Sequence, residues 1–210
     1  MIKRILFDLD NTLFPFLEEY WDSLTDALIE EHLQSDQKIQ IQLKENVRQY
    51  ENEYSMYTKE DMLAILDRNL PFRLPETFVD TWIKHLSRCY PKNTESTKDV
   101  LRYLSQKYEL VVLTNWFTEQ QSARLKGAEL DIYFDEIIGT DQVLNKPNKE
   151  AFLKGCGKYK PEECIMIGDN LEGDILGALH AGLQGIYLNK TDKKTKYKEI
   201  ESLEELKEIL

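Results

Sequence analysis

Two carboxylates near the amino terminus are the first residues whose spacing points to chemistry. Asp8 and Asp10 directly follow residues 2–7, an apolar run with the length of a buried strand. Two such charges about 4 Å apart repel by roughly 4 kcal/mol at an effective dielectric constant of about 20. Clustered carboxylates therefore usually require a cation or a shared proton. The alternative is that Asp10 caps a turn while Asp8 faces solvent.

A second acidic group follows another apolar run, residues 164–168. It contains Asp169, Asn170 and Asp174. Because the carboxyl ends of parallel strands meet at one edge of a sheet, Asp169 can approach Asp8 if the two strands are neighbours. Magnesium suits such an oxygen-rich site, since it binds a few carboxylates and keeps waters that a phosphate can displace. Taken alone, the second group could be only the start of a helix.

Two further polar groups complete the predicted edge. Thr114 and Asn115 end an apolar run, and Lys146 precedes a predicted helix. A hydroxyl, an amide and an ammonium can together bind the equatorial oxygens of a transferring phosphoryl group. Considered separately, strand-end threonines also cap helices and most lysines face water.

The remaining pattern predicts the elements that must position these groups. Apolar runs of strand length alternate with segments of helical periodicity, which favours an α/β fold with a Rossmann-like, doubly wound parallel sheet. The predicted strands are residues 2–7, 110–114, 136–139, 164–168 and 184–188, and the predicted crossover helices are residues 97–106, 119–127, 149–157 and 173–181.

One interval interrupts this alternation. Residues 15–91 are far too long for an ordinary connection and carry apolar residues at helical spacing, with Thr58 and Asp61 resembling a capping box. We therefore predict a Rossmann-like catalytic core formed by residues 1–14 and 92–210, and a helical cap of about four helices formed by residues 15–91. The cap leaves the core where open α/β sheets bind ligands, so it can act as a lid.

The composition limits the partners. The chain has 210 residues, 41% of them hydrophobic, and a net charge of −11. This charge disfavours nucleic acids and anionic membranes. No apolar run is long enough to span a bilayer, and we expect no signal peptide. With three cysteines and no CxxC pair, we expect reduced thiols and a cytoplasmic location. A basic run near the end is expected to be a solvated loop: Lys190, Lys193, Lys194, Lys196 and Lys198.

These segments carry a resemblance to a known family. In order and placement they resemble the four motifs of the haloacid dehalogenase-like hydrolases, and the match extends over nearly the whole chain. The helical insert is similar to the C1-type cap of that family. The matching segments are Asp8-Leu9-Asp10-Asn11-Thr12, Thr114, Lys146-Pro147, and Gly168-Asp169-Asn170 with Asp174.

The resemblance implies a phosphatase that acts on a small phosphorylated metabolite through an aspartyl phosphate. Asp8 is then the nucleophile, and Asp10 is the acid that protonates the leaving oxygen and afterwards the base that activates water. Thr114, Asn115 and Lys146 are then the groups that bind the phosphoryl oxygens.

The resemblance also implies a magnesium cofactor. Its ligands are then the carboxylates of Asp8 and Asp169 and the backbone carbonyl of Asp10, with Asn170 and Asp174 in support. The ion would offset the repulsion among the carboxylates and allow an anionic substrate to approach an acidic protein.

Several alternatives stay open. Dehalogenation is disfavoured, because dehalogenases of the family lack an acid at the position of Asp10. A phosphomutase would use the same aspartate, and a noncatalytic module would bind a phosphorylated ligand without turnover. Trp116 could face the substrate or pack in the interior. Within the cap, Tyr20 and Tyr54 are candidates for substrate recognition. The sequence leaves the substrate and the oligomeric state undetermined.

Overall fold

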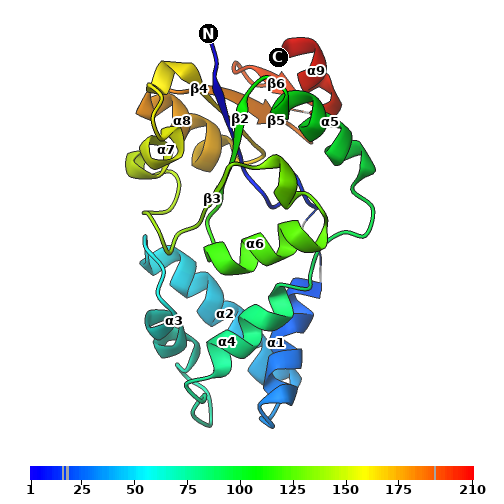
Figure 1. Cartoon of the computed structure of the whole chain (residues 1–210). Coiled ribbons are helices and arrows are strands. Elements are labelled where there is room, and N and C mark those ends of the chain that lie inside the picture. The colour runs from blue at the N-terminus through cyan, green and yellow to red at the C-terminus, as the bar shows by residue number, and fades with distance from the viewer. Residues whose placement is uncertain (16, 18, 192) are drawn as a thin grey trace.

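A parallel sheet forms the centre of the fold. The computed structural model describes residues 1–15, 17, 19–191 and 193–210. Within them, six parallel strands lie in the order β3-β2-β1-β4-β5-β6 (Figure 1). This confirms the predicted α/β fold, and the short β6 is an addition to it. The strands are β1 (Arg4–Phe7), β2 (Glu109–Leu113), β3 (Glu136–Ile138), β4 (Cys164–Gly168), β5 (Gln184–Leu188) and β6 (Glu199–Ile200).

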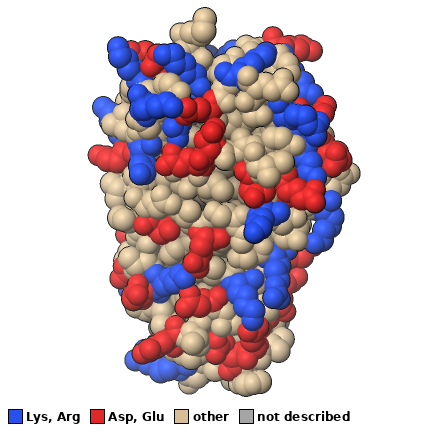
Figure 2. All heavy atoms as spheres, viewed as in Figure 1, with Lys and Arg blue, Asp and Glu red and all other residues tan. Residues whose placement is uncertain are grey.

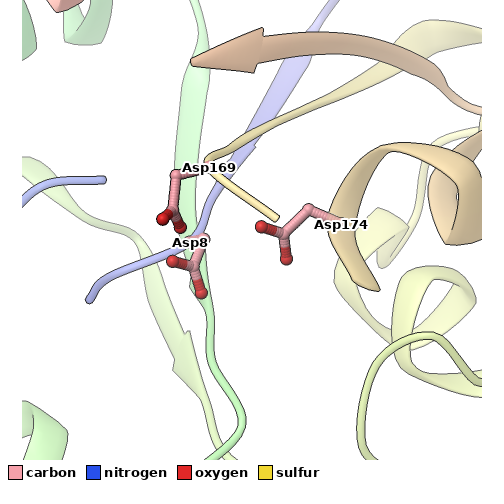
Figure 3. Close-up of side chains that lie close together, drawn as sticks. All are labelled: Asp8, Asp169 and Asp174. Atoms are coloured by element: carbon pink, nitrogen blue, oxygen red, sulfur yellow. The ribbon is translucent and has the colours of Figure 1, made fainter. Parts of the chain in front are cut away.

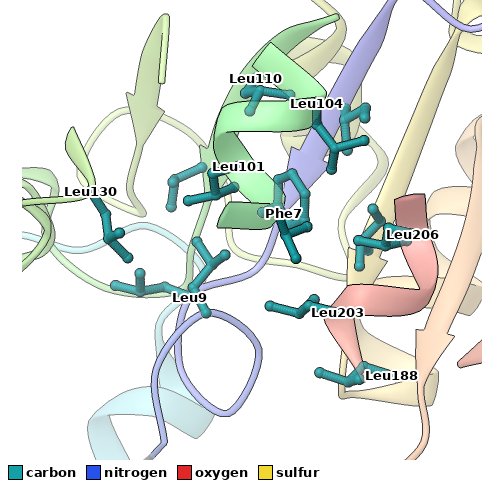
Figure 4. Packing of buried hydrophobic residues seen from close by; sticks show 14 of the residues in the cluster. Phe7, Leu9, Leu101, Leu104, Leu110, Leu130, Leu188, Leu203 and Leu206 are labelled. Carbon is teal, nitrogen blue, oxygen red and sulfur yellow. The ribbon is translucent and has the colours of Figure 1, made fainter. Parts of the chain in front are cut away.

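Helices cover both faces of the sheet, which explains why its central strands are apolar throughout. Side chains alternate along β1, so Ile5 and Phe7 join one hydrophobic cluster and Leu6 joins another. The first cluster packs under α5 (Glu95–Ser105), α6 (Thr118–Gly127) and α9 (Leu206–Ile209), as Figure 4 shows around Phe7. The second packs under α7 (Lys149–Cys156) and α8 (Gly177–Ala181).

Among the residues that the structure describes, four helices occupy the long interval after β1. They are α1 (Glu19–Glu30), α2 (Gln37–Glu53), α3 (Lys59–Leu66) and α4 (Phe78–Leu86). Asp36 caps α2, and the predicted cap at Thr58 is present, since its hydroxyl accepts from the backbone N–H of Asp61 at 3.1 Å. Apolar faces of all four helices meet in a cluster centred on buried residues such as Tyr50 and Trp82.

These four helices stand beside the carboxyl ends of the strands (Figure 1). Trp116 and Phe117, which follow β2, pack into the same hydrophobic cluster. Two backbone hydrogen bonds also cross between the parts: Tyr57 N–H to Thr140 O at 3.0 Å and Asn145 N–H to Ser55 O at 2.6 Å. The arrangement suits a cap that closes over the edge of the sheet, and the division at residues 14/15 and 91/92 stays a prediction.

One predicted helix differs in detail from the structure. Residues 173–181 were expected to form one helix, but the segment begins as a π-helix, η3 (Leu171–Leu176), and continues as α8. The cause is local: Asn170 accepts from Gly173 N–H through its side chain, while its carbonyl accepts from Asp174 N–H at 2.8 Å and Ile175 N–H at 3.4 Å. These bonds widen the first turn.

The exterior agrees with the composition. No helix among the described residues is both long enough and apolar enough to cross a membrane. Acidic and basic side chains are interspersed over the face drawn in Figure 2.

Candidate active site

The register of the sheet brings the predicted motifs together. Phe7 pairs with Val112 of β2 and with Ile167 of β4. The next residue, Asp8, therefore leaves the sheet beside the ends of both neighbours, and its N–H donates to the carbonyl of Ile167 at 2.9 Å. Thr114 and Asp169 follow the same two strands, so three of the four motifs start from one edge.

Asp8 is nearly enclosed, with a side chain that is 13% exposed, and its Oδ1 lies 2.6 Å from Nζ of Lys146. Burial raises the pKa of Asp8 to about 7, and the charge of Lys146 opposes this rise. The geometry gives a carboxylate that is held by one buried ammonium.

Lys146 bridges two carboxylates, because its Nζ also lies 2.6 Å from Oδ1 of Asp174. Burial alone would lower the pKa of Lys146, but the charges of Asp174 and Asp8 outweigh it and raise the pKa above its ordinary value. The lysine is thus a fixed cation. Its backbone is held by Asn115, whose amide donates to Lys146 O at 2.9 Å and accepts from Lys146 N–H at 2.7 Å.

Three carboxylates form a group that fits a divalent cation. Oxygens of Asp8, Asp169 and Asp174 all lie within 4.8 Å of one another, and Figure 3 shows the three side chains turned toward a common space. Lys146 pairs with two of these carboxylates, Asp8 and Asp174, and burial raises the pKa of Asp169. A hard cation with oxygen ligands, such as magnesium, would relieve both the repulsion and the loss of hydration.

Asn170 and Asp174 occupy supporting positions. The Asn170 side chain caps the π-helix, and the backbone N–H of Asn170 donates to Oδ2 of Asp174 at 3.1 Å. Asp174 is buried and receives hydrogen bonds from Lys146 and Asn170 on different oxygens. This agrees with a residue that orients Lys146 and adds negative charge beside the cation position. Their predicted role as metal support stays a prediction.

Asp10 belongs to a different environment, although it is two residues from Asp8. Arg124 forms a bidentate pair with it, with Nη2 at 2.7 Å from Oδ1 and Nη1 at 3.1 Å from Oδ2. The Tyr20 hydroxyl donates to Oδ1 at 3.2 Å and the Gln121 amide donates to Oδ2 at 3.2 Å. Gln121 also donates to Oγ1 of Thr114 at 2.9 Å, which links the second motif to Asp10.

A cavity of about 300 Å³ opens beside Asp10, between the cap and the core. Aromatic side chains form much of its wall, and two arginines and two carboxylates add charge. The predicted contribution of Tyr20 is consistent with its place in this wall, whereas Tyr54 stacks on Tyr50 at 4.8 Å and is not part of it. The cavity is lined by Asp10, Tyr20, Trp21, Val47, Arg48, Glu51, Trp82, Leu86, Asn115, Trp116, Gln120, Gln121 and Arg124.

Trp116 combines both interpretations that its sequence position allowed. It lines the cavity, and it also packs edge-to-face against Trp82 at 5.7 Å and Tyr57 at 5.8 Å. The indole therefore forms a rigid part of the cavity wall, supported by the cap's hydrophobic cluster.

Some residues of the site were not identified from sequence. Arg124 and Gln121 lie on the buried face of α6, where an amphipathic helix normally carries apolar residues. Two polar residues at positions i and i+3 of that face are the sequence signal that could have identified them. Lys190, which we assigned to a solvated loop, is exposed but donates to the carbonyl of Asn11 at 2.7 Å. Its ammonium thus adds positive charge beside the first motif.

Fold and site together define a class: an α/β protein with a buried aspartate–lysine pair and a carboxylate cluster at the carboxyl edge of a parallel sheet. Residues 2–182 match the model of the haloacid dehalogenase-like hydrolases, and the chain belongs to this family. The family assignment and the enzymatic class predicted from sequence are thereby confirmed.

Individual relatives extend the comparison. The chain is 27% identical over 233 residues to glyceraldehyde 3-phosphate phosphatase of Methanothermobacter thermautotrophicus, covering 100% of both chains. It is 35% identical over 101 residues to N-acylneuraminate-9-phosphatase of Rattus norvegicus, covering 46% of this chain and 41% of that protein. Its fold is similar to that of the hydrolase YfnB from Bacillus subtilis, with a TM-score of 0.73, 24% identity, and 100% and 98% of the two chains covered.

Proposed function

We propose that the protein is a magnesium-dependent phosphatase that hydrolyses a small phosphorylated metabolite through an aspartyl phosphate on Asp8. The observation that carries this proposal is the position of Asp8: its carboxylate is 2.6 Å from a buried lysine and within 4.8 Å of two further carboxylates. Full-length relatives named as glyceraldehyde 3-phosphate phosphatases support a phosphorylated metabolite as substrate.

In the first step, an oxygen of Asp8 attacks phosphorus while the bond from phosphorus to the leaving oxygen breaks. Asp10, carrying a proton, gives it to that oxygen, so the alcohol departs neutral. Lys146 and the Thr114 hydroxyl lie at the same edge and would hold the phosphoryl oxygens. Asn115 is already bonded to the backbone of Lys146, so we assign it the positioning of that lysine in addition to its predicted phosphate contact.

In the second step, water attacks the phosphorus of the aspartyl phosphate and the bond from phosphorus to Asp8 breaks. Asp10, now a carboxylate, takes a proton from the water. Inorganic phosphate leaves, and Asp8 and Asp10 return to their starting states. A magnesium ion bound by Asp8 and Asp169 would supply positive charge that shields the phosphoryl group from the surrounding carboxylates.

The cavity beside Asp10 is the proposed site for the leaving portion of the substrate. Its volume of about 300 Å³ suits a small metabolite. Arg48 is an exposed lining residue whose guanidinium lies 5.9 Å from the ring centroid of Trp21, so a polar leaving group can be contacted by both a cation and an aromatic face. All three cysteines are free thiols, which supports the cytoplasm as the compartment.

The test is a screen for phosphate release from sugar phosphates, triose phosphates, nucleoside monophosphates and amino-sugar phosphates, with and without magnesium. We expect one class to be hydrolysed only in the presence of the ion. A requirement for a catalytic amount of a bisphosphate would instead indicate a phosphomutase. Binding of the ion and a phosphorylated ligand without turnover would indicate a noncatalytic module and overturn the proposal.

A paired substitution tests the cavity. Arg48→Met should change the ranking of preferred metabolites while leaving hydrolysis of acetyl phosphate within about threefold, because a minimal donor does not reach the cavity. Arg68 is the matched control, since it is an exposed cap arginine paired with Glu53 and does not line the cavity. An equal change in ranking for Arg68→Met would exclude a specific contact by Arg48.

A further inference from the structure

Arg124 is the most enclosed charged residue beside the site. It is 1% exposed, and each nitrogen of its guanidinium donates to a named acceptor. Nη1 and Nη2 bind the two oxygens of Asp10, Nη1 also binds Gln121 Oε1 at 2.6 Å, and Nε binds the carbonyl of Cys89 at 2.8 Å. Burying an arginine costs free energy because the guanidinium loses its hydration, and here hydrogen bonds from all three nitrogens offset that loss. A lysine could not make these bonds, because it lacks the planar fork of donors.

The contacts of Arg124 reach both segments that connect the four-helix insert to the sheet. Tyr20 lies in the first turn of α1, where the outgoing connection enters the insert, and the guanidinium lies 4.4 Å from the centroid of its ring. Cys89 belongs to the returning segment after α4, and its carbonyl accepts from Arg124 at 2.8 Å. The Tyr20 hydroxyl lies 3.2 Å from Asp10 Oδ1 and 3.3 Å from the same Cys89 carbonyl. A single cluster thus joins Asp10 to the two cap connections.

The orientation of Asp10 is fixed by four hydrogen bonds. Two come from Arg124, one from Tyr20 and one from Gln121, and a carboxylate has about four acceptor positions. The bonds from Tyr20 and Gln121, both 3.2 Å, are longer than the 2.7 Å bond from Nη2. When Asp10 carries the proton for the leaving oxygen, one of the longer bonds can give way while the arginine fork keeps the carboxyl group in place.

We propose that Arg124 is a positioning residue that holds Asp10 against the leaving oxygen and ties this orientation to the placement of the cap. This inference rests on the proposed function, because it assumes that Asp10 transfers a proton to and from the reacting oxygens. A proton donor must lie within hydrogen-bonding reach of its target, so a small displacement of Asp10 slows only the steps that need the proton.

The test compares a leaving group that needs a proton with one that does not. Arg124→Lys keeps the charge but removes the fork. With saturating magnesium, the first-turnover rate of glycerol release from glycerol phosphate should fall about 100-fold with the half-saturating concentration within about threefold, since general acid catalysis contributes about 10²–10⁴-fold. The first-turnover rate of acetate release from acetyl phosphate, whose leaving group departs without help, should stay within about fivefold of wild type. Only the first step is followed, because water attack in the second step needs Asp10 for both donors.

The matched control is Arg4→Lys. Arg4 is also buried and paired with two carboxylates, Glu109 at 3.3 Å and Glu136 at 2.5 Å, but it lies at the opposite end of β1 from Asp8. This variant should lower the melting temperature without changing the ratio of the two activities. If Arg124→Lys does not fold, Tyr20→Phe takes its place, with an expected loss of about threefold to tenfold on glycerol phosphate only.

The outcomes separate the two proposals. Equal losses on both donors, or no loss on either, would overturn the role of Arg124 and leave the phosphatase intact. Wild-type protein that releases phosphate from neither donor and from no metabolite of the screen with magnesium would overturn the proposed function, and the role of Arg124 would fall with it.

Discussion

Asp8 and Asp10 leave the same strand two residues apart, yet they lie in contrasting surroundings. Asp8 is 13% exposed and shares Lys146 with Asp174 in a group of three carboxylates. Asp10 is 32% exposed and has its own cation, Arg124. Directly after Asp10 the chain turns sharply toward the insert. Asn11 has a positive φ of 61°, and Asp10 forms a β-bridge with Phe14. Two identical side chains therefore lie in different electrostatic environments, because each is paired with a different cation.

The largest expected effect is at Asp8. Asp8→Asn removes the attacking oxygen with almost no change in shape, so turnover should fall by about 10⁴-fold or more for every phosphate donor. Phosphate release and circular dichroism on the same preparation would show whether the loss is chemical. Activity near that of wild type would end the assignment of Asp8 as nucleophile.

Asp10→Asn should have a smaller and selective effect. We expect a loss of about 100-fold for alkyl phosphates and a much smaller loss for activated donors, since a good leaving group needs little protonation. First-turnover release of glycerol from glycerol phosphate and of acetate from acetyl phosphate measures the difference, because the later attack of water needs Asp10 for both donors. If Asp10 were equivalent to Asp8, both donors would be affected alike, and the contrast between the two regions would disappear.

The metal requirement should depend on Asp169. Chelation should abolish activity and magnesium should restore it, and Asp169→Ala should raise the magnesium concentration for half-maximal activity by about tenfold or more, because a direct oxygen ligand is lost. Glu172→Ala, on the same π-helical segment but outside the carboxylate group, serves as control. Full activity in excess chelator would contradict the proposed metal site.

The smallest expected effect concerns stability and pH. Because burial raises the pKa of Asp8 to about 7, the folded metal-free protein binds an extra proton between the ordinary carboxyl range and that value. Its stability should therefore fall as pH rises toward 7, and ionised Asp8 should be unfavourable above it. Asp8→Asn should raise the free energy of unfolding of the metal-free protein, and this increase should be larger at pH 8 than at pH 5 by on the order of 1–2 kcal/mol.

Thermal unfolding of wild type and Asp8→Asn at both pH values, without and with magnesium, measures this effect. Magnesium should stabilise the wild type at pH 8 and stabilise the variant less, since the variant lacks one anionic ligand. A stability difference that does not change with pH would show that the charge of Asp8 is already compensated by Lys146.

The sequence by itself determined the parallel sheet and the order of its motifs. Apolar runs such as residues 164–168 are fully buried because helices cover both faces, and this pattern depends on local composition. Asp8, Thr114 and Asp169 could be placed at one edge from sequence, since each follows a strand and parallel strands end on the same side. The four-helix insert followed from its length and periodicity.

Only the tertiary structure decided which cation each carboxylate receives. Arg124 meets Asp10 across 114 positions of sequence and Lys146 meets Asp8 across 138 positions, and no local pattern pairs residues at such distances. The cavity likewise needs Trp21 and Arg48 from the insert beside Trp116 from the core. Spacing along a strand fixes which edge a side chain reaches, whereas its partners depend on how helices distant in sequence pack against that edge.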